Sequence, residues 1–120
     1  MIYSTCIDIV SIQRLEWLVN DNAFLDRLLT DRERQYIFTK RYSHKHLAGR
    51  FAAKEAVMKA LGTGWDKRVG WRDIEVRNCR SGKPMVLLHS KAKALLQGGK
   101  VFLSISYAGD IATAFAVIEK

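Results

Sequence analysis

The chain has 120 residues, 48% of them hydrophobic, which suits one compact domain over residues 1–120. Lys and Arg outnumber Asp and Glu by 20 to 12, so the net charge of +8 favours a polyanionic ligand: nucleic acid, a phosphorylated cofactor, anionic lipid or an acidic protein. Cys6 and Cys79 have neither metal-ligand spacing nor a disulfide pattern. Since no stretch has the length of a bilayer span or a secretory leader, we expect a cytoplasmic protein with no membrane partner.

The first half of the chain predicts one strand followed by helices. Alternating β-branched residues indicate the strand, and the spacing of Thr30 and Glu33 is that of a capping box. Gly62-Thr63-Gly64 ends the last helix with residues that tolerate left-handed backbone and the close approach of another group. The expected elements are a strand from Ile2 to Val10, short helices over Ile12 to Val19 and Phe24 to Leu28, a helix that begins at Thr30, and a long helix from about Ser43 to Leu61.

The second half predicts mainly strands. Ser81-Gly82-Lys83-Pro84 is a turn signal between two short apolar runs, and therefore indicates a hairpin. We expect Ser90 to cap a helix that stops before Gly98-Gly99. The strands are expected over Ile74 to Val76, Met85 to Leu88, Val101 to Tyr107 and Ile111 to Ile118, with the helix from Ser90 to Leu96. The predicted fold class is α+β, a mostly antiparallel sheet packed against one long helix.

The long helix has no polar face, although it carries charges. At 3.6 residues per turn its alanines, Phe51, Val57 and Met58 cover every side. A helix that is apolar all round is normally buried. Its charged residues must then be paired or face a ligand, and these residues are Arg50, Lys54, Glu55 and Lys59.

Two carboxylates are candidates for a metal site. Asp8 lies in the middle of an apolar strand and Glu55 on the apolar helix, where an ionised carboxylate is costly without a cation or strong donors. Together they offer the oxygen ligands of a hard divalent cation such as Mg²⁺. Asp8 could equally be the structural partner of a core Arg or Lys.

The cations on the helix fit a bound pyrophosphate, because Arg50 and Lys54 are one turn apart and Lys59 is one turn beyond Glu55. The alternative is ordinary: Glu55 and Lys59 form a helix salt bridge, while Arg50 and Lys54 extend to water. Spacing alone does not choose between these readings.

Other chemistry-bearing residues are expected to be structural. The histidines lack a ligand partner at suitable spacing, so we interpret them as surface or capping residues. The tryptophans do not alternate with basic residues along one strand, so they are expected to pack or to form the lip of a site rather than stack on bases. These residues are His44, His46, His89, Trp17, Trp65 and Trp71.

Several blocks in order resemble the holo-[acyl-carrier-protein] synthases, the small 4'-phosphopantetheinyl transferases. The most specific is Lys-Glu-Ala-x-x-x-Lys-Ala-x-Gly-Thr-Gly, which runs from Lys54 to Gly64. The others are Ile7-Asp8-Ile9-Val10 with Arg14, Leu47 to Phe51, Gly82-Lys83-Pro84 and Leu103-Ser104-Ile105-Ser106. The resemblance implies the 4'-phosphopantetheinyl transferase fold and a homotrimer with active sites at subunit interfaces. It also implies Mg²⁺-dependent transfer of 4'-phosphopantetheine from coenzyme A to a serine of an acidic apo-acyl carrier protein, as in fatty acid biosynthesis, with release of adenosine 3',5'-bisphosphate and no nucleic-acid partner.

The resemblance also implies a role for each candidate residue. Asp8 and Glu55 would be the metal ligands and, with Lys59, the catalytic residues. Arg14 would contact the carrier protein. The coenzyme A contacts would be Arg50, Lys54, Lys59, Gly62, Thr63, Gly64, Ser106 and Tyr107.

Two departures from the family pattern leave alternatives open. Family members typically continue Ser-Ile-Ser with His-Thr, whereas this chain has Tyr107-Ala108, which removes an imidazole and a hydroxyl. The helix after Asp8 often carries several basic residues, but here Arg14 is accompanied by Glu16, Asp21 and Asp26. A catalytically weakened relative that binds coenzyme A or a carrier is therefore one alternative. A basic nucleic-acid-binding domain, which rests on net charge alone, is another.

Overall fold

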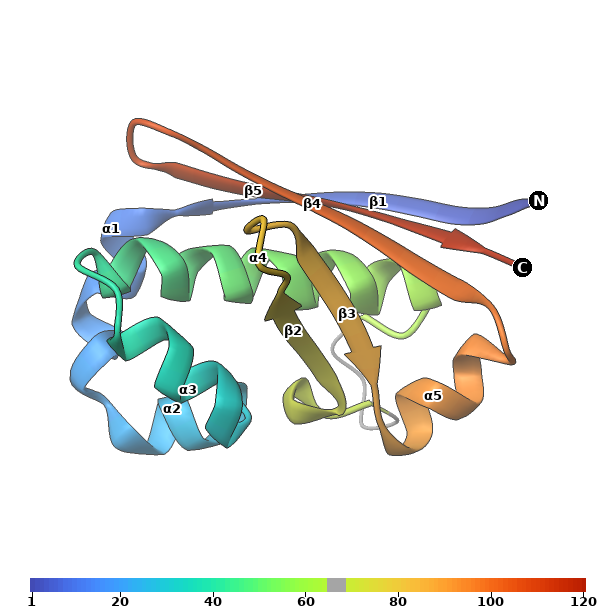
Figure 1. Cartoon of the computed structure of the whole chain (residues 1–120), viewed down its shortest axis with the longest axis horizontal. Helices are drawn as coiled ribbons and strands as arrows, with labels where there is room; N and C mark the ends of the chain where they lie inside the picture. Colours follow the sequence, from blue (N-terminus) through green and yellow to red (C-terminus); the bar gives the residue numbers. More distant parts are fainter. Residues whose placement is uncertain (65–68) are drawn as a thin grey trace.

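A computed structural model describes residues 1–64 and 69–120. A three-stranded antiparallel sheet in the order β1-β5-β4 covers one long helix, α4, and a two-stranded antiparallel hairpin contacts α4 through β2 and the sheet through β3 (Figure 1). The elements are β1 (Ile2–Ser11), α1 (Ile12–Glu16), η1 (Trp17–Asn20), α2 (Asn22–Leu28), α3 (Asp31–Phe38), α4 (Ser43–Leu61), η2 (Trp71–Asp73), β2 (Ile74–Asn78), β3 (Pro84–Leu88), α5 (Ser90–Leu96), β4 (Lys100–Ala108) and β5 (Ile111–Glu119).

The predicted α+β class with antiparallel pairing and one long helix is confirmed, although the strands form two sheets. The capping box is present, since the Thr30 hydroxyl accepts from the Glu33 amide and the Glu33 carboxylate accepts from the Thr30 amide. The prediction that Ser90 caps α5 is wrong: His89 precedes the helix without a side-chain cap, and Ser90 is its first residue, with φ +50°. Trp65 lies outside the described residues.

Small side chains let α4 pack closely under the sheet. Every second residue of β5 faces inward, and these are the buried Ala112, Ala114, Ala116 and Ile118, three of them alanines. They meet a helix whose own alanines are also buried, as the lack of a polar face predicts. None of the helices in the described parts of the chain is both long and apolar enough to span a bilayer.

The outer face of the three-stranded sheet exposes several large apolar side chains among serines and threonines. The strand register places Ile7 of β1 beside Phe115 of β5, and Phe115 beside Ser104 of β4. A contiguous exposed apolar surface on a soluble domain usually marks an interaction site. The exposed large side chains of the three strands' outer face include Tyr3, Ile7, Ile9, Phe102, Ile111 and Phe115.

Candidate active site

Asp8 lies on the edge strand β1, on the face that packs against α4. Side chains alternate along the strand, so Cys6, Asp8 and Val10 point toward the helix, and Asp8 is 8% exposed. Thr113 of the neighbouring strand β5 donates a hydrogen bond from its hydroxyl to the Asp8 backbone carbonyl at 2.9 Å. Strand pairing therefore fixes the position of this carboxylate.

The two oxygens of Asp8 have different surroundings. Lys59 Nζ donates a hydrogen bond to Oδ1 at 2.8 Å, whereas Oδ2 is buried and has no hydrogen-bond partner in the described part of the chain. The hydrogen bond to Asp8, and next the charge of that carboxylate, raise the pKa of Lys59, which therefore stays an ammonium ion at neutral pH. A buried carboxylate oxygen without a donor is costly, so Oδ2 is suited to bind a further cation.

Glu55 shares a cavity with Asp8. It is one turn before Lys59 on α4, and its negative charge contributes to the raised pKa of Lys59. The structure thus brings together Asp8, Glu55 and Lys59, three of the residues expected from the sequence. The cavity measures about 490 Å³ and is lined by Asp8, Ile9, Val10, Arg14, Leu15, Leu18, Phe24, Phe51 and Glu55.

The donor set of this cavity fits Mg²⁺. Magnesium prefers oxygen ligands, and it commonly takes one or two protein carboxylates and completes its octahedron with water and phosphate oxygens. Asp8 Oδ2 and the Glu55 carboxylate can supply the protein's share. Arg14 lines the same cavity and is exposed.

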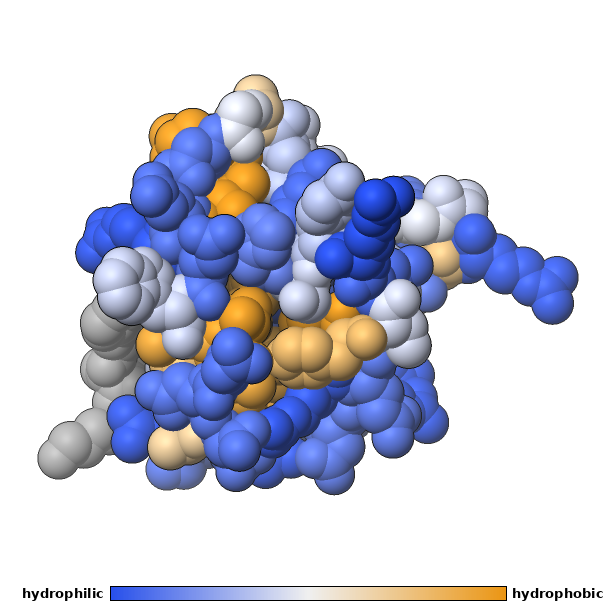
Figure 2. All heavy atoms as spheres, turned by 90° about the vertical axis from the view of Figure 1, so that its left-hand side faces the viewer, coloured by the Kyte–Doolittle hydropathy of each residue, from blue (hydrophilic) through white to orange (hydrophobic). Residues whose placement is uncertain are grey.

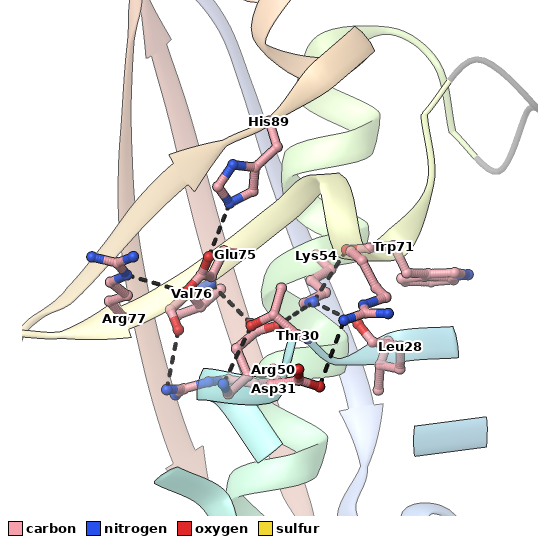
Figure 3. A network of polar contacts seen from close by, with 12 residues as sticks. Leu28, Thr30, Asp31, Arg50, Lys54, Trp71, Glu75, Val76, Arg77 and His89 are labelled. Atoms are coloured by element: carbon pink, nitrogen blue, oxygen red, sulfur yellow. Dashed lines mark hydrogen bonds and ion pairs between the residues drawn. The ribbon is translucent and has the colours of Figure 1, made fainter. Parts of the chain in front are cut away.

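Lys54 does not join this site. Its side chain is fully buried and its ammonium donates three hydrogen bonds, to Glu33 Oε1 at 2.6 Å, to the Leu28 carbonyl at 2.6 Å and to the Trp71 carbonyl at 3.1 Å (Figure 3). All three protons are used, so the expected phosphate contact does not fit its position. Lys54 instead connects α4 to the end of α2, to α3 and to η2.

Glu33 completes this buried network. Its Oε1 also accepts from the Thr30 amide at 2.9 Å, and its Oε2 accepts from the Val76 amide of β2 at 2.9 Å (Figure 3). The sequence indicates Glu33 as a capping residue, but its capping geometry alone gives no signal of the pair with Lys54, 21 residues away. We refer to Glu33, Lys54 and their backbone partners as the Lys54 network.

Arg50 also lies away from the Asp8 cavity. It is 2% exposed, donates to Asn78 Oδ1 at 2.7 Å and stacks on the Tyr36 ring, with 4.7 Å from Cζ to the ring centroid. It lines a second cavity of about 420 Å³ with Arg32, Arg77 and other residues. The alternative that Arg50 and Lys54 extend to water is wrong, since both are buried.

The end of α4 has the geometry that its glycines predict. Gly62 has φ +85° and Gly64 φ +54°, both in the left-handed region that favours glycine. Thr63 between them is buried, and its hydroxyl donates to the Met58 carbonyl at 3.2 Å. This turn begins at Gly62, three residues after Lys59, so its backbone is close in sequence to a residue that contacts Asp8.

Ser106 and Tyr107 lie on opposite faces of β4. Ser106 is exposed on the outer face, paired with Thr113 in register. Tyr107 points inward and contacts the Gly49 backbone of α4, where a side chain on residue 49 would overlap its hydroxyl. Burial raises the pKa of Tyr107, against the opposing effect of Arg50, so the phenol is neutral at physiological pH.

Phe24 and Phe51 line the Asp8 cavity, a position that the sequence did not indicate. Phe24 and Phe51 lie 6.4 Å apart between ring centroids, and Trp71 stacks on Phe51 at 5.2 Å. Trp71 therefore packs as expected. Trp17 does not pack, because it is 82% exposed. The helical spacing of Phe51 predicts burial, but nothing in the local sequence predicts that it borders a cavity.

The fold and this site define a small α+β protein with a carboxylate-lined cavity suited to a divalent cation. Residues 6–116 match the family model of the 4'-phosphopantetheinyl transferase superfamily, and the chain belongs to this family. A holo-[acyl-carrier-protein] synthase of Geotalea daltonii is 47% identical over the full length of both chains.

Solved structures of similar sequence have the same fold as this chain. The holo-[acyl-carrier-protein] synthase of Neisseria meningitidis superposes with a TM-score of 0.90 at 38% identity and covers both chains completely. That of Helicobacter pylori, in complex with coenzyme A, gives a TM-score of 0.86 at 32% identity over 96% of this chain and 99% of that one.

Proposed function

We propose that the protein transfers 4'-phosphopantetheine from coenzyme A to a serine of an apo-acyl carrier protein, with Mg²⁺, and releases adenosine 3',5'-bisphosphate in the cytoplasm. One observation carries this proposal: Asp8 and Glu55 line the same cavity, and the buried Oδ2 of Asp8 has no donor among the described residues. Family membership supports it, as do relatives named for this activity and a related structure that contains coenzyme A.

The residues suggest how the reaction proceeds. Asp8 and Glu55 would hold Mg²⁺, which when bound offsets the charge of the pyrophosphate. Lys59 adds positive charge beside the reacting phosphate, where it stabilises the charge that spreads over the oxygens in the transition state. The serine oxygen attacks the phosphorus that bears the pantetheine, and the bond to adenosine 3',5'-bisphosphate breaks. The serine proton passes to water or to one of the two carboxylates.

The rest of coenzyme A would extend from this cavity along the protein. Gly62, Thr63 and Gly64 offer backbone that a nucleotide can approach closely, and Ser106 and Tyr107 remain proposed contacts on β4. Arg50 and Lys54 are not proposed as phosphate ligands of the Asp8 cavity in the same chain, because both are turned away from it.

A homotrimer is part of the proposal. The apolar outer face of the sheet is exposed in the single chain, and association between copies would remove it from water. The family resemblance implies active sites at subunit interfaces. Because Ser106 is exposed on the outer face of the sheet, it would lie near a neighbouring copy in such a trimer.

The test is a transfer assay. The protein is incubated with coenzyme A, Mg²⁺ and the apo form of a bacterial fatty-acid acyl carrier protein, and the carrier is weighed by mass spectrometry. We expect the carrier to gain one phosphopantetheine, and to gain nothing when a chelator removes the metal. An unchanged carrier across several carrier proteins would contradict the proposal. If coenzyme A still bound, that result would instead support the weakened relative suggested by Tyr107-Ala108.

A further inference from the structure

The helix α1 begins without a cap of its own. Ser11 precedes it in extended backbone, but within the described chain the Ser11 side chain makes no capping hydrogen bond to the amides of α1. The first amides of a helix have no acceptor inside the helix and must find one elsewhere. An acceptor for α1 is therefore expected from another part of the chain.

Asp110, in the turn between β4 and β5, supplies that acceptor. The Gln13 amide donates a hydrogen bond to Asp110 Oδ1 at 2.8 Å, and the Ser11 hydroxyl donates to Oδ2 at 2.5 Å. The Ile12 amide donates to the Asp110 backbone carbonyl at 2.7 Å. Hydrogen bonds to a carboxylate are stronger than those between neutral groups. One residue of a turn distant in sequence thus holds three consecutive residues at the junction of β1 and α1.

The Asp110 side chain serves this junction rather than its own turn. Left-handed backbone at Gly109, with φ +55°, allows the tight turn, and both hydrogen bonds of the Asp110 carboxylate go to residues outside it. Strand pairing between Ser11 and Ile111 already joins the end of β1 to β5. The carboxylate therefore adds something that strand pairing does not provide: it fixes the direction in which the chain enters α1.

The helix α1 depends on such outside contacts because it has only five residues. A helix of this length is unstable by itself in water. Its buried side chains, Ile12 and Leu15, pack in the core, whereas Arg14 is exposed. Arg14 and Leu15 both line the Asp8 cavity, so the position of α1 decides where this wall of the cavity lies.

The turn and α1 lie at the same end of the molecule (Figure 1). Figure 2 faces this end, where apolar surface shows between hydrophilic side chains. The first residues of α4 also reach it, and a cavity of about 430 Å³ lies there, lined by Ile12, Tyr42, His44, Lys45, Gly109 and Asp110. Because this cavity leaves space beside the turn, the hydrogen bonds of Asp110 gain in importance for holding the turn to α1.

We infer that Asp110 is a positioning residue of the transfer reaction: it holds α1 so that Arg14 and Leu15 form a fixed wall beside Asp8. This inference rests on the proposed function. Without the carboxylate, the first turn of α1 loses a hydrogen-bond acceptor and opens more often. A carrier protein that contacts Arg14 would then have to order α1 as it binds, which lowers its affinity. The proposed metal ligands and Lys59 lie on β1 and α4, so we expect the chemistry at saturating carrier to be unchanged.

The experiment compares steady-state transfer by Asp110→Ala and Asp110→Asn, with the apo form of a bacterial fatty-acid acyl carrier protein as substrate. For Asp110→Ala we expect the KM for the carrier to rise at least about fivefold, while kcat and the KM for coenzyme A stay within about twofold. Asp110→Asn should retain most of the carrier affinity, because its amide oxygen can accept from the Gln13 amide. Asp31→Ala is the control, since it removes the same charge from a side chain that is 96% exposed at the start of α3 and lines no part of the Asp8 cavity.

A double-mutant cycle with Arg14→Ala distinguishes positioning from a general effect on stability. If Asp110 acts through Arg14, Asp110→Ala should change the carrier KM by less than about twofold once Arg14 is absent. A purely structural residue would raise this KM by the same factor in both backgrounds. Ser11→Ala deletes one of the three hydrogen bonds and should raise the carrier KM at least about twofold. It takes the place of Asp110→Ala in the cycle if that variant does not fold.

The outcomes separate the two proposals. If the unmodified protein transfers phosphopantetheine and the carrier KM is unchanged in Asp110→Ala, or in Ser11→Ala where that variant replaces it, the positioning role is wrong and the function stands. The same rise in both backgrounds of the cycle, or an equal loss of affinity in Asp110→Asn, would likewise overturn the inference. If the unmodified protein does not modify the carrier, the proposed function fails and the inference fails with it.

Discussion

Lys59 neutralises only one side of Asp8: its ammonium lies 2.8 Å from Oδ1, while Oδ2 is buried without a donor in the described chain. The pair is also unequal in its access to water, since the Lys59 side chain is 47% exposed and that of Asp8 only 9%. A pair built solely for stability would be expected to satisfy both oxygens. The arrangement therefore favours a role for Asp8 in binding a cation.

Asp8→Ala should lose activity without losing the fold. Transfer is expected to fall at least about 100-fold, because a metal ligand is removed. The melting temperature should stay the same or rise, since the change deletes a carboxylate with a buried unsatisfied oxygen, and the exposed Lys59 can turn to water. Thermal unfolding and a Mg²⁺ titration of transfer check both parts. Near-normal turnover at saturating Mg²⁺ would remove Asp8 from the metal site.

Lys54→Met should lower the free energy of unfolding, because Lys54 belongs to the buried Lys54 network. The change leaves the Glu33 carboxylate buried without its cation, which typically costs about 3–5 kcal/mol. Lys59→Met is the comparison on the same helix, and we expect it to cost less than Lys54→Met, because Lys59 is half-exposed and Asp8 lines a cavity in which water can hydrate its carboxylate. Urea unfolding of the two variants compares them directly. Equal stability would mean that the Lys54 network does not hold these elements together.

Lys54 and Lys59 show which features of the site could be predicted from the sequence and which could not. Strand alternation and helix periodicity are local rules, so they placed Asp8 and Glu55 on buried faces and indicated a common site. They also predicted α4 from Ser43 to Leu61 with its left-handed end at Gly62.

What the sequence could not predict depends on contacts distant along the chain. Lys54 and Lys59 are equally basic and lie on one helix, yet one pairs with Glu33 of α3 and the other with Asp8 of β1. Helix spacing fixes their separation and not the element that each one meets. Arg50 likewise pairs with Asn78, 28 residues away in sequence. Residues on an all-buried helix can therefore be identified as partnered, while their partners require the tertiary structure.

Gly49→Ala should destabilise the protein, although alanine normally stabilises a helix interior relative to glycine by roughly 0.5–1 kcal/mol. The added methyl group would overlap the Tyr107 hydroxyl, and such overpacking typically costs about 1–3 kcal/mol. Because the closest atom is that hydroxyl, Gly49→Ala should be less harmful in a Tyr107→Phe background. A double-mutant cycle by urea unfolding measures this coupling. Additive effects would show that the two residues do not compete for space.

Glu75→Gln should flatten the acid limb of the stability curve. Burial tends to raise the pKa of Glu75, but hydrogen bonds with His89 and Arg77 outweigh it, so this pKa lies below its ordinary value of 4.5. A carboxyl with a depressed pKa stabilises the fold fully above its unfolded-state value, and the contribution is lost as the pH falls through the folded-state value. The variant should be less stable by about 1–3 kcal/mol at neutral pH. That difference should shrink below pH 4.5, as denaturant unfolding across pH can show; a constant difference would contradict it.

Phe115→Lys should dissociate the proposed trimer without unfolding the chain. Phe115 lies in the centre strand of the sheet, beside Ile7 and Ser104 on the outer face, and is 44% exposed. A charge there would cost little in the single chain, but it would be buried unpaired between copies. Phe38→Lys on α3 is the control, because Phe38 has the same 44% exposure away from this face. Light scattering should give three times the chain mass of 13.7 kDa for the unmodified protein and the control, and a smaller species for Phe115→Lys. A single-chain mass for the unmodified protein would exclude the trimer, and an unchanged trimer in Phe115→Lys would move its interface off the sheet.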